Sequence, residues 1–527
     1  MKPPQLLIIV VVVLFYSLYT ASVPQALFSD SAWGMLTAKS MNEQAPFNHY
    51  IEPLSTDISK DAMVFQTWWT PGQYLMPYLI QKSFPLTLGS TLLIITILSS
   101  IIGLLGLFKL YKSFGFSNFI IGLTLIVIVF QRSFSFPFSF YHGGEILLFS
   151  ILPWLFYLMI SNSTRLNWQK VLAFSMLCIV GFTFKSSMLV SMLAILFSMF
   201  VINVLKHSKP HSVSLPKLWQ TVNSKPILIN GIKLAAICTL TVVPLYLLFL
   251  SKGSNPTTLS KFSFEFMDIL FPLSSPFNSA FSFDAIINKV LDVFSNSNID
   301  QADRAIVYLP ISVAVILVLR FILKSEFLSA KYKIVLFCTC FVFISFFTFF
   351  YAFNADISYE GRHFKILGIL ILPAVLQAGI NSSRKLVPAG MYLLIILVST
   401  YGILSFVNRK LYINENYTLN ADKYFMEIAD PEAFEHLMQI DQSKLNEEKL
   451  IYVFSPEIAL QIKNSRYISS HALYQEPEYL ASKEFHGSAG RIYLFVPKSF
   501  EIDHKLDAIT SSFKQYGDWY KEYSTPN

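Results

Sequence analysis

Apolar runs of about 16–22 residues recur from about residue 5 to residue 407, separated by short polar stretches. A helix of that length crosses a hydrocarbon core of about 30 Å. We therefore predict a mainly α, polytopic integral membrane protein with about eleven transmembrane helices. The predicted spans are residues 5–22, 86–108, 117–131, 145–161, 170–184, 187–205, 227–250, 304–323, 332–352, 365–380 and 387–407.

The distribution of charge separates this part of the chain from its tail. The sequence is 54% hydrophobic and only 14% charged, whereas an average soluble domain is about 25% charged. From residue 408 onward there are 13 Lys+Arg and 18 Asp+Glu, a balance of −5, so the total of +7 leaves +12 on the membrane part. These basic residues are scattered over many loops and form no single patch, so a nucleic-acid partner is not indicated.

The Lys and Arg residues of the short loops orient the predicted spans. They fall on one side of the membrane if the N-terminus is cytoplasmic, and eleven spans then place the C-terminus outside. These residues are Lys109, Lys112, Arg165, Lys170, Lys206, Lys209, Lys217, Lys225, Lys324, Lys331, Lys333, Arg384 and Lys385. The first run is either a cleaved signal peptide, since Ala21-Ser22-Val23 resembles a cleavage site, or an uncleaved anchor, which the many following spans favour.

Two domains are expected, a transmembrane domain over 1–407 and a soluble extracytoplasmic α/β domain over 408–527. Residues 450–454 and 491–496 have the composition of strands, and 431–438 and 505–513 have a helical pattern. Long outer loops are expected at about 24–85 and 251–303. Bulky outer loops on a compact inner face indicate chemistry on the outer side, and a bacterial inner membrane is the expected location.

No cofactor is expected, although a divalent metal stays open. The sequence has no P-loop, dinucleotide fingerprint, HExxH or GxSxG motif. All four cysteines, Cys178, Cys238, Cys338 and Cys340, lie inside apolar runs. The predicted outer parts therefore contain no disulfide framework and no thiolate zinc site.

The first long loop carries the first candidate site residues. It opens with Phe28-Ser29-Asp30-Ser31-Ala32-Trp33, which places a carboxylate close to the membrane surface, where it has to be solvated or paired. Asp30 suits a reaction on a membrane-bound substrate, and it also suits an ordinary helix N-cap. Further along, Trp68 and Trp69 precede a Pro-Gly turn and either bind substrate or anchor the loop at the interface. His49 is a candidate substrate ligand in the same loop.

Cationic and acidic residues mark the predicted outer ends of later spans. His142-Gly143-Gly144-Glu145 begins the fourth span, where Glu145 is either a ligand or a carboxylate favoured by the helix dipole. Glu360-Gly361-Arg362-His363-Phe364-Lys365 precedes the tenth span. Arg362 is suited to bidentate phosphate binding and Lys365 adds a point charge. With Arg132 and Lys185, these cations form a candidate site for an anionic lipid headgroup, the alternative being snorkelling side chains.

These features together resemble the GT-C glycosyltransferases, a superfamily that includes protein mannosyltransferases and aminoarabinose transferases. Asp30-Ser31-Ala32-Trp33 is similar to that family's Asp-x-Ala-x-aromatic opening, and Trp69-Thr70-Pro71-Gly72-Gln73-Tyr74 to its Pro-rich helix before the second span. The Glu360 segment, followed by Leu372-Pro373, resembles its Glu-Arg-Tyr…Pro segment. Ser31 stands where many relatives have a second acid, Gly361 is inserted, and the first long loop has no Asp-x-Asp pair.

The resemblance implies an inverting glycosyltransferase that moves a sugar from a polyprenyl-phosphate donor to a glycan, lipid or protein hydroxyl. Asp30 would be its single general base, and Arg362 with His363 or Lys365 would offset the charge of the departing phosphate. His142, Glu145 and Glu360 would position the substrates. An O-antigen-type polymerase or ligase, and a lipid or sugar transporter, remain the alternatives. The folded tail and Asp30 favour transfer, and the scarcity of ionisable residues within the spans disfavours transport.

Overall fold

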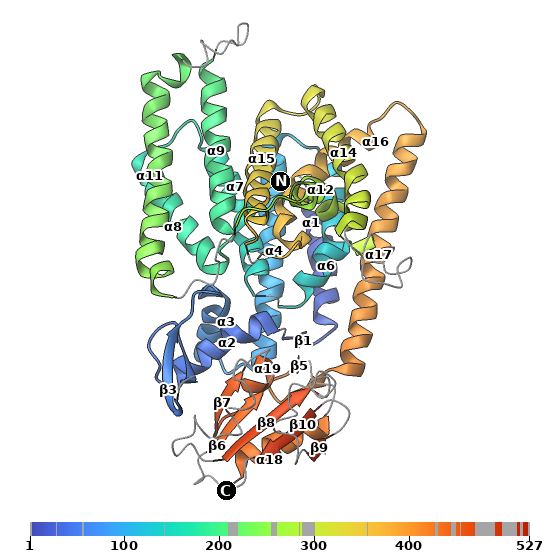
Figure 1. Ribbon diagram of the computed structural model, residues 1–527. Helices are drawn as coiled ribbons and strands as arrows, with labels where there is room; N and C mark the ends of the chain where they lie inside the picture. Colours follow the sequence, from blue (N-terminus) through green and yellow to red (C-terminus); the bar gives the residue numbers. More distant parts are fainter. Residues whose placement is uncertain are drawn as a thin grey trace. The chain divides into compact units, whose positions relative to one another are not determined.

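The computed structural model describes residues 3–27, 29–54, 57–141, 143–208, 220–253, 261–283, 285–286, 301–355, 357–426, 431–443, 449–453, 455–469, 491–497, 514–516 and 520–524. The chain divides into two compact units, and Figure 1 labels most of their elements. Unit 1 consists of Met1–Ser22, Thr96–Ser139 and Gly144–Asn408. Unit 2 consists of Val23–Ile95, Phe140–Gly143 and Arg409–Asn527.

Unit 1 is helical, and each of the predicted spans coincides with one of its helices. Within the described residues, eight helices are long and apolar enough to cross a membrane. Shorter apolar stretches are Val11–Ala21, which is part of α1, Asn118–Phe130 and Trp168–Phe184. The elements are α1 (Pro3–Ala21), α4 (Leu88–Phe114, from Thr96 on), α5 (Asn118–Phe130), α6 (Arg132–Ser139), α7 (Gly144–Ser161), α8 (Trp168–Phe184), α9 (Met188–His207), α11 (Lys225–Leu248), η1 (Leu250–Lys252), α12 (Phe266–Phe281), α14 (Gln301–Lys324), α15 (Ala330–Ala352), η2 (Gly361–Phe364), α16 (Lys365–Ile380) and α17 (Leu386–Asn416, up to Asn408). The protein is therefore a polytopic integral membrane protein.

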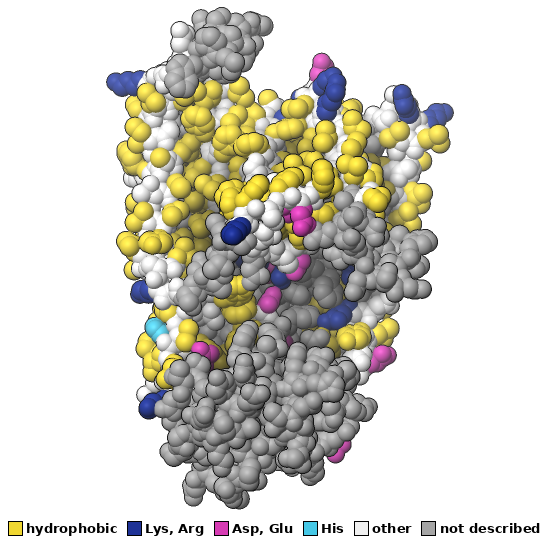
Figure 2. All heavy atoms as spheres, viewed as in Figure 1, with side chains coloured by type: hydrophobic (Ala, Val, Ile, Leu, Met, Phe, Trp, Pro, Cys, Tyr) yellow, Lys and Arg dark blue, Asp and Glu magenta, His cyan; other side chains and the backbone are white. Residues whose placement is uncertain are grey.

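The helices of unit 1 begin at local capping signals and expose apolar side chains. Ser117, Asn167 and Ser329 each accept a hydrogen bond from a first-turn amide of α5, α8 and α15. In the face drawn in Figure 2, hydrophobic side chains cover the helices of this unit. On α11 and α17, large apolar residues are about half exposed or more, as a lipid-facing surface requires; they include Val243, Leu247, Leu248, Leu393, Ile396 and Leu397.

Helix α12 lies within the segment 251–303, which was predicted to be a long outer loop. This helix is buried over most of its length and packs against α14, α15 and α16. Its prolines and serines lower its hydropathy, so it does not register as an apolar run. The hydroxyl groups of Ser274 and Ser275 donate to the carbonyl of Phe271, at 2.9 Å and 2.7 Å, which satisfies their polarity inside the protein.

Unit 2 combines residues of the first long loop with the tail. The predicted loop at 24–85 contains β1 (Gln25–Ala26), α2 (Ser29–Asn42), the hairpin β2 (His49–Leu54) and β3 (Asp57–Phe65), and α3 (Gly72–Ser83). The tail contributes β4 (Thr418–Leu419) and β5 (Tyr424–Met426). These two strands form a three-stranded sheet with β1, in which the central strand β5 is parallel to β1 and antiparallel to β4.

The remaining tail elements build the expected α/β structure. They are α18 (Pro431–Gln442), β6 (Lys449–Val453), α19 (Pro456–Ala459), β7 (Arg466–Ser469), β8 (Arg491–Pro497), β9 (Lys514–Tyr516) and β10 (Tyr520–Ser524). The sheet has the order β7-β6-β8-β10-β9, with β6 parallel to both β7 and β8 and the other pairs antiparallel. The predicted helix at 505–513 lies outside the described residues.

Candidate functional site

A pocket in unit 1 gathers most of the predicted cations. It has an empty volume of about 530 Å³, part of which is open to solvent. Its polar lining residues are Glu145, Lys185, Ser187, Ser191, Arg362, His363 and Lys365. Its apolar lining residues are Phe138, Leu148, Phe149, Leu152, Pro153, Phe343, Ile366 and Ile369. The pocket thus combines charged side chains with a mainly apolar wall.

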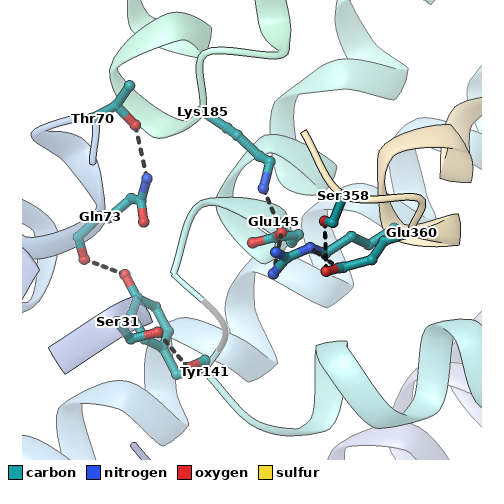
Figure 3. Close-up of polar contacts among 9 residues, drawn as sticks. Ser31, Thr70, Gln73, Tyr141, Glu145, Lys185, Ser358 and Glu360 are labelled. Carbon is teal, nitrogen blue, oxygen red and sulfur yellow. Dashed lines mark hydrogen bonds and ion pairs between the residues drawn. The ribbon is translucent and has the colours of Figure 1, made fainter. Parts of the chain in front are cut away.

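Glu145 is the centre of the charges in this pocket. Its side chain is only 9% exposed and forms an ion pair with Lys185 (Figure 3). The Nη1 atom of Arg362 lies 3.9 Å from the same carboxylate oxygen. Arg362 also pairs through Nε with Glu360, which accepts a hydrogen bond of 2.7 Å from Ser358. The lining of the pocket thus includes the cations Lys185, Arg362 and Lys365 together with the carboxylate of Glu145.

Helix ends place these side chains. Glu145 lies in the first turn of α7, where the helix dipole favours a carboxylate. Lys185 directly follows α8 as its C-cap residue, and its backbone there is extended. Arg362 and His363 lie in η2, directly before Lys365 begins α16. Short polar segments between apolar helices thus bring residues from distant parts of the sequence into one pocket.

The segment before η2 is held by α12 and α15. The hydroxyl of Tyr359 donates to the carboxylate of Asp268, which is 2% exposed in the first turn of α12. The ring of Tyr359 stacks on Tyr351 of α15, with centroids 4.2 Å apart. Burial, together with the hydrogen bond to Asp268, raises the pKa of Tyr359, so that this phenol stays protonated and can donate.

Two further groups lie at the polar end of the pocket. The Nε2 atom of His363 is buried and makes no hydrogen bond to any of the described residues. The Lys365 ammonium lies 4.3 Å from the centroid of the Phe138 ring, a cation–π distance. A buried ring nitrogen without a protein partner is a group that an entering ligand can satisfy.

Arg132 was predicted to join these cations, but it is not among the residues that line the pocket. It begins α6, and its guanidinium donates a hydrogen bond of 2.9 Å to the hydroxyl of Tyr401 on α17. In the structure, its observed role is to connect two helices of unit 1.

The other predicted site residues belong to unit 2. Asp30 is exposed, in the first turn of α2. On the same helix, Trp33 stacks on Trp69 with ring centroids 6.0 Å apart, and Trp68 packs edge-on against Trp69. His49 begins β2 and contacts Phe65 of the neighbouring strand. His142 lies outside the described residues.

The comparisons with known proteins concern the fold. No family model and no curated protein matches the sequence. The apo oligosaccharyltransferase of Archaeoglobus fulgidus is similar in structure, with a TM-score of 0.52 and 11% identity over 95% of this chain and 70% of that chain. The fold is GT-C-like. ArnT from Cupriavidus metallidurans bound to undecaprenyl phosphate also matches, with a TM-score of 0.45 and 10% identity over 99% of this chain and 98% of that chain. Its apo state matches with a TM-score of 0.44 and 11% identity over 98% of this chain and 97% of that chain.

The GT-C-like fold confirms the predicted fold class, while the roles of the individual site residues stay predictions. Sequence reasoning missed Asp268 and Tyr359, which hold the segment of Arg362 in place. One signal was available, because Glu265 and Asp268 have the spacing of a capping box and form one at the start of α12. Ser187 and Ser191 were missed because hydroxyl groups inside an apolar run usually bond to their own helix.

Proposed function

We propose that this protein transfers a sugar from a polyprenyl-phosphate donor to an acceptor hydroxyl at the outer face of the membrane. The pocket in unit 1 is the observation that carries this proposal. A polyprenyl phosphate is an anion joined to a long hydrocarbon chain, and the pocket offers Lys185, Arg362 and Lys365 beside an apolar wall. The GT-C-like fold agrees with such a reaction but does not by itself establish it.

The proposed reaction does not need a general acid. A lipid phosphate is already a good leaving group, so the developing negative charge has to be offset and the oxygen need not be protonated. Arg362 can bind two phosphate oxygens at once, and Lys185 adds a point charge. The Nε2 atom of His363, which has no partner among the described residues, is available to a further phosphate oxygen.

We assign the general base to Asp30. Its carboxylate is exposed at the beginning of α2, where an acceptor hydroxyl can reach it. The base would remove the acceptor proton as the hydroxyl oxygen attacks the anomeric carbon and the bond from that carbon to the phosphate oxygen breaks. One displacement of this kind inverts the anomeric configuration.

Transfer of radiolabelled sugar from a panel of polyprenyl-phosphate donors tests the proposal in membranes that contain wild type or Asp30→Asn at matched expression. We expect wild type to transfer the sugar and the transfer rate of the variant to be about 10²–10⁴-fold lower, which is the usual contribution of a general base. Asp61→Asn is the matched control, because Asp61 is an exposed acid of unit 2 that pairs with Arg466 in the described structure. We expect this control to keep its activity.

The two ways in which this experiment can fail separate the function from the site. Equal transfer by wild type and Asp30→Asn would leave glycosyl transfer standing and would move the base to Glu145 or Glu360. Absence of transfer from every donor would overturn the proposed function and favour the polymerase, ligase or transporter reading.

A further inference from the structure

The peptide group of Tyr141 is held from both ends by side chains that flank Asp30 in the sequence. The Tyr141 N–H donates to Oε1 of Gln25 at 2.7 Å. The Ser31 hydroxyl donates to the Tyr141 carbonyl at 3.1 Å, as Figure 3 shows. Gln25 and Ser31 are 1% and 4% exposed, so neither bond competes with bulk water. We call these three residues the Tyr141 clamp.

The same segment is fixed on a third side by α3. The Tyr141 hydroxyl donates to the carbonyl of Gln73 in the first turn of that helix. Gly143 has a φ of +59°, and a Cβ atom at this position would lie 2.5 Å from the Gln73 side chain. Only glycine fits there without strain. Tyr141 is thus held by residues of β1, α2 and α3, all in unit 2.

Gln25, in turn, depends on the tail. It lies in β1, where Gln25 pairs with Tyr424 and Ala26 with Phe425 in the parallel ladder to β5. The Leu27 N–H extends this pairing with a bond of 3.1 Å to the carbonyl of Phe425. Because β5 is the central strand of its sheet, both of its edges are occupied, by β1 and by β4.

The turn before β5 is also anchored. The Asn420 side chain accepts a hydrogen bond of 3.2 Å from the Tyr424 N–H. The Gly89 N–H donates to the carbonyl of Asp422 at 2.8 Å. A Cβ atom on Gly89 would lie 1.9 Å from the carbonyl oxygen of Lys423, so the turn rests directly on this glycine.

We propose that the tail and the Tyr141 clamp position the catalytic carboxylate of Asp30. Strand β5 fixes β1, Gln25 and Ser31 fix both ends of the Tyr141 peptide, and Asp30 lies between these two residues in the chain. This inference rests on the proposed function and goes beyond it, because it assigns a role in the reaction to the C-terminal part. Small displacements of a reacting group, about 1 Å, can lower a rate about a hundredfold.

Gln25→Met and Ser31→Ala test the clamp, since the first removes the hydrogen bond to the Tyr141 N–H, the second removes the bond to the Tyr141 carbonyl, and both change the side-chain volume little. We expect kcat to fall about tenfold or more in each, while the KM for the donor and the affinity for a polyprenyl phosphate stay unchanged. The matched control is Gln439→Met, the same substitution at an exposed position of α18. Hydrogen exchange at residues 140–143 should accelerate in the two clamp variants only.

The Asp30→Asn background separates positioning from a general structural role. If the clamp acts through Asp30, Gln25→Met causes no further loss in that background, whereas a destabilised fold lowers activity there as well. Phe425→Pro tests the tail, because proline is not tolerated in the central strand of a sheet. Gln515→Pro in the edge strand β9 is its control and should be far milder.

The outcomes separate this inference from the proposed function. Wild type that transfers sugar, with Asp30→Asn inactive and Gln25→Met fully active, overturns the positioning role alone. Further loss from Gln25→Met in the Asp30→Asn background also overturns it. Wild type that transfers from no donor overturns the proposed function, and the positioning role with it.

Discussion

Replacement of Glu145 by glutamine tests the charge balance of the pocket. The Glu145 carboxylate is 9% exposed and lies 3.9 Å from the guanidinium of Arg362. At that distance, an effective dielectric constant of about 20 gives an attraction of about 4 kcal/mol. Arg362 is 35% exposed, so screening by solvent reduces this to about 2 kcal/mol. A phosphate that binds Arg362 has to compete with this attraction.

Glu145→Gln should therefore bind a polyprenyl phosphate about 30-fold more tightly than wild type does, since 1.4 kcal/mol corresponds to about a factor of ten. The dissociation constant of a short-chain polyprenyl phosphate, measured by calorimetry on the detergent-solubilised protein, checks this value. The difference should shrink as ionic strength rises. Asp61→Asn, which removes the carboxylate that pairs with Arg466, should leave the dissociation constant unchanged. An unchanged or weaker affinity in Glu145→Gln would refute the view that the carboxylate and the phosphate share these cations.

Two further predictions concern unit 2. Burial lowers the pKa of Lys39 from 10.5 to about 8. Between these two pH values the side chain binds more protons in the unfolded chain than in the folded one, so the free energy of unfolding should rise with pH by about 3 kcal/mol at most. Thermal unfolding measured across this pH range should show the rise in wild type and not in Lys39→Met. Gly89→Ala should lower the free energy of unfolding by more than about 2 kcal/mol, because the alanine Cβ would overlap the Lys423 carbonyl group. It should also make the tail sensitive to limited proteolysis. Gly231→Ala, the same change with nothing within 4 Å, should be neutral or stabilising by roughly 0.5–1 kcal/mol.

The membrane helices could be predicted because an apolar run is a local property of the sequence. The span predicted at 86–108, for example, lies almost wholly within α4, Leu88–Phe114. The ends are less well predicted, because hydropathy marks the apolar part of a helix and says nothing about where its backbone hydrogen bonds stop. Thus α17 continues to Asn416, nine residues beyond the predicted end at 407.

Helix α12 shows what local patterns miss. Pro272, Pro276 and several serines give it the composition of a loop, and its burial depends on three neighbouring helices that lie elsewhere in the sequence. The Ser279 hydroxyl reaches the carbonyl of Phe364 at 3.1 Å, next to the charged segment of the pocket. No sequence period encodes such a contact.

The candidate site was predictable as a set of residue types and only partly as a place. Cations at the ends of apolar runs indicated Lys185, Arg362 and Lys365, which do line one pocket. Arg132 had the same local signal but donates to Tyr401, a partner set by the packing of α17. The Tyr141 clamp was also hidden from the sequence, because both of its bonds use backbone atoms, which every residue carries.

The pairing of β1 with β5 has a consequence for biosynthesis. Ala26 and Phe425 are partners in one ladder although 399 positions separate them in the chain. At about 5–20 residues per second, β1 emerges about 20–80 s before its partner strand is made. During that interval its edge is open to the wrong neighbour. Assembly of this unit therefore has to wait until the last apolar helix has been inserted, and a ribosome stalled late in the message would release a chain whose membrane helices are complete but whose first strand has no partner.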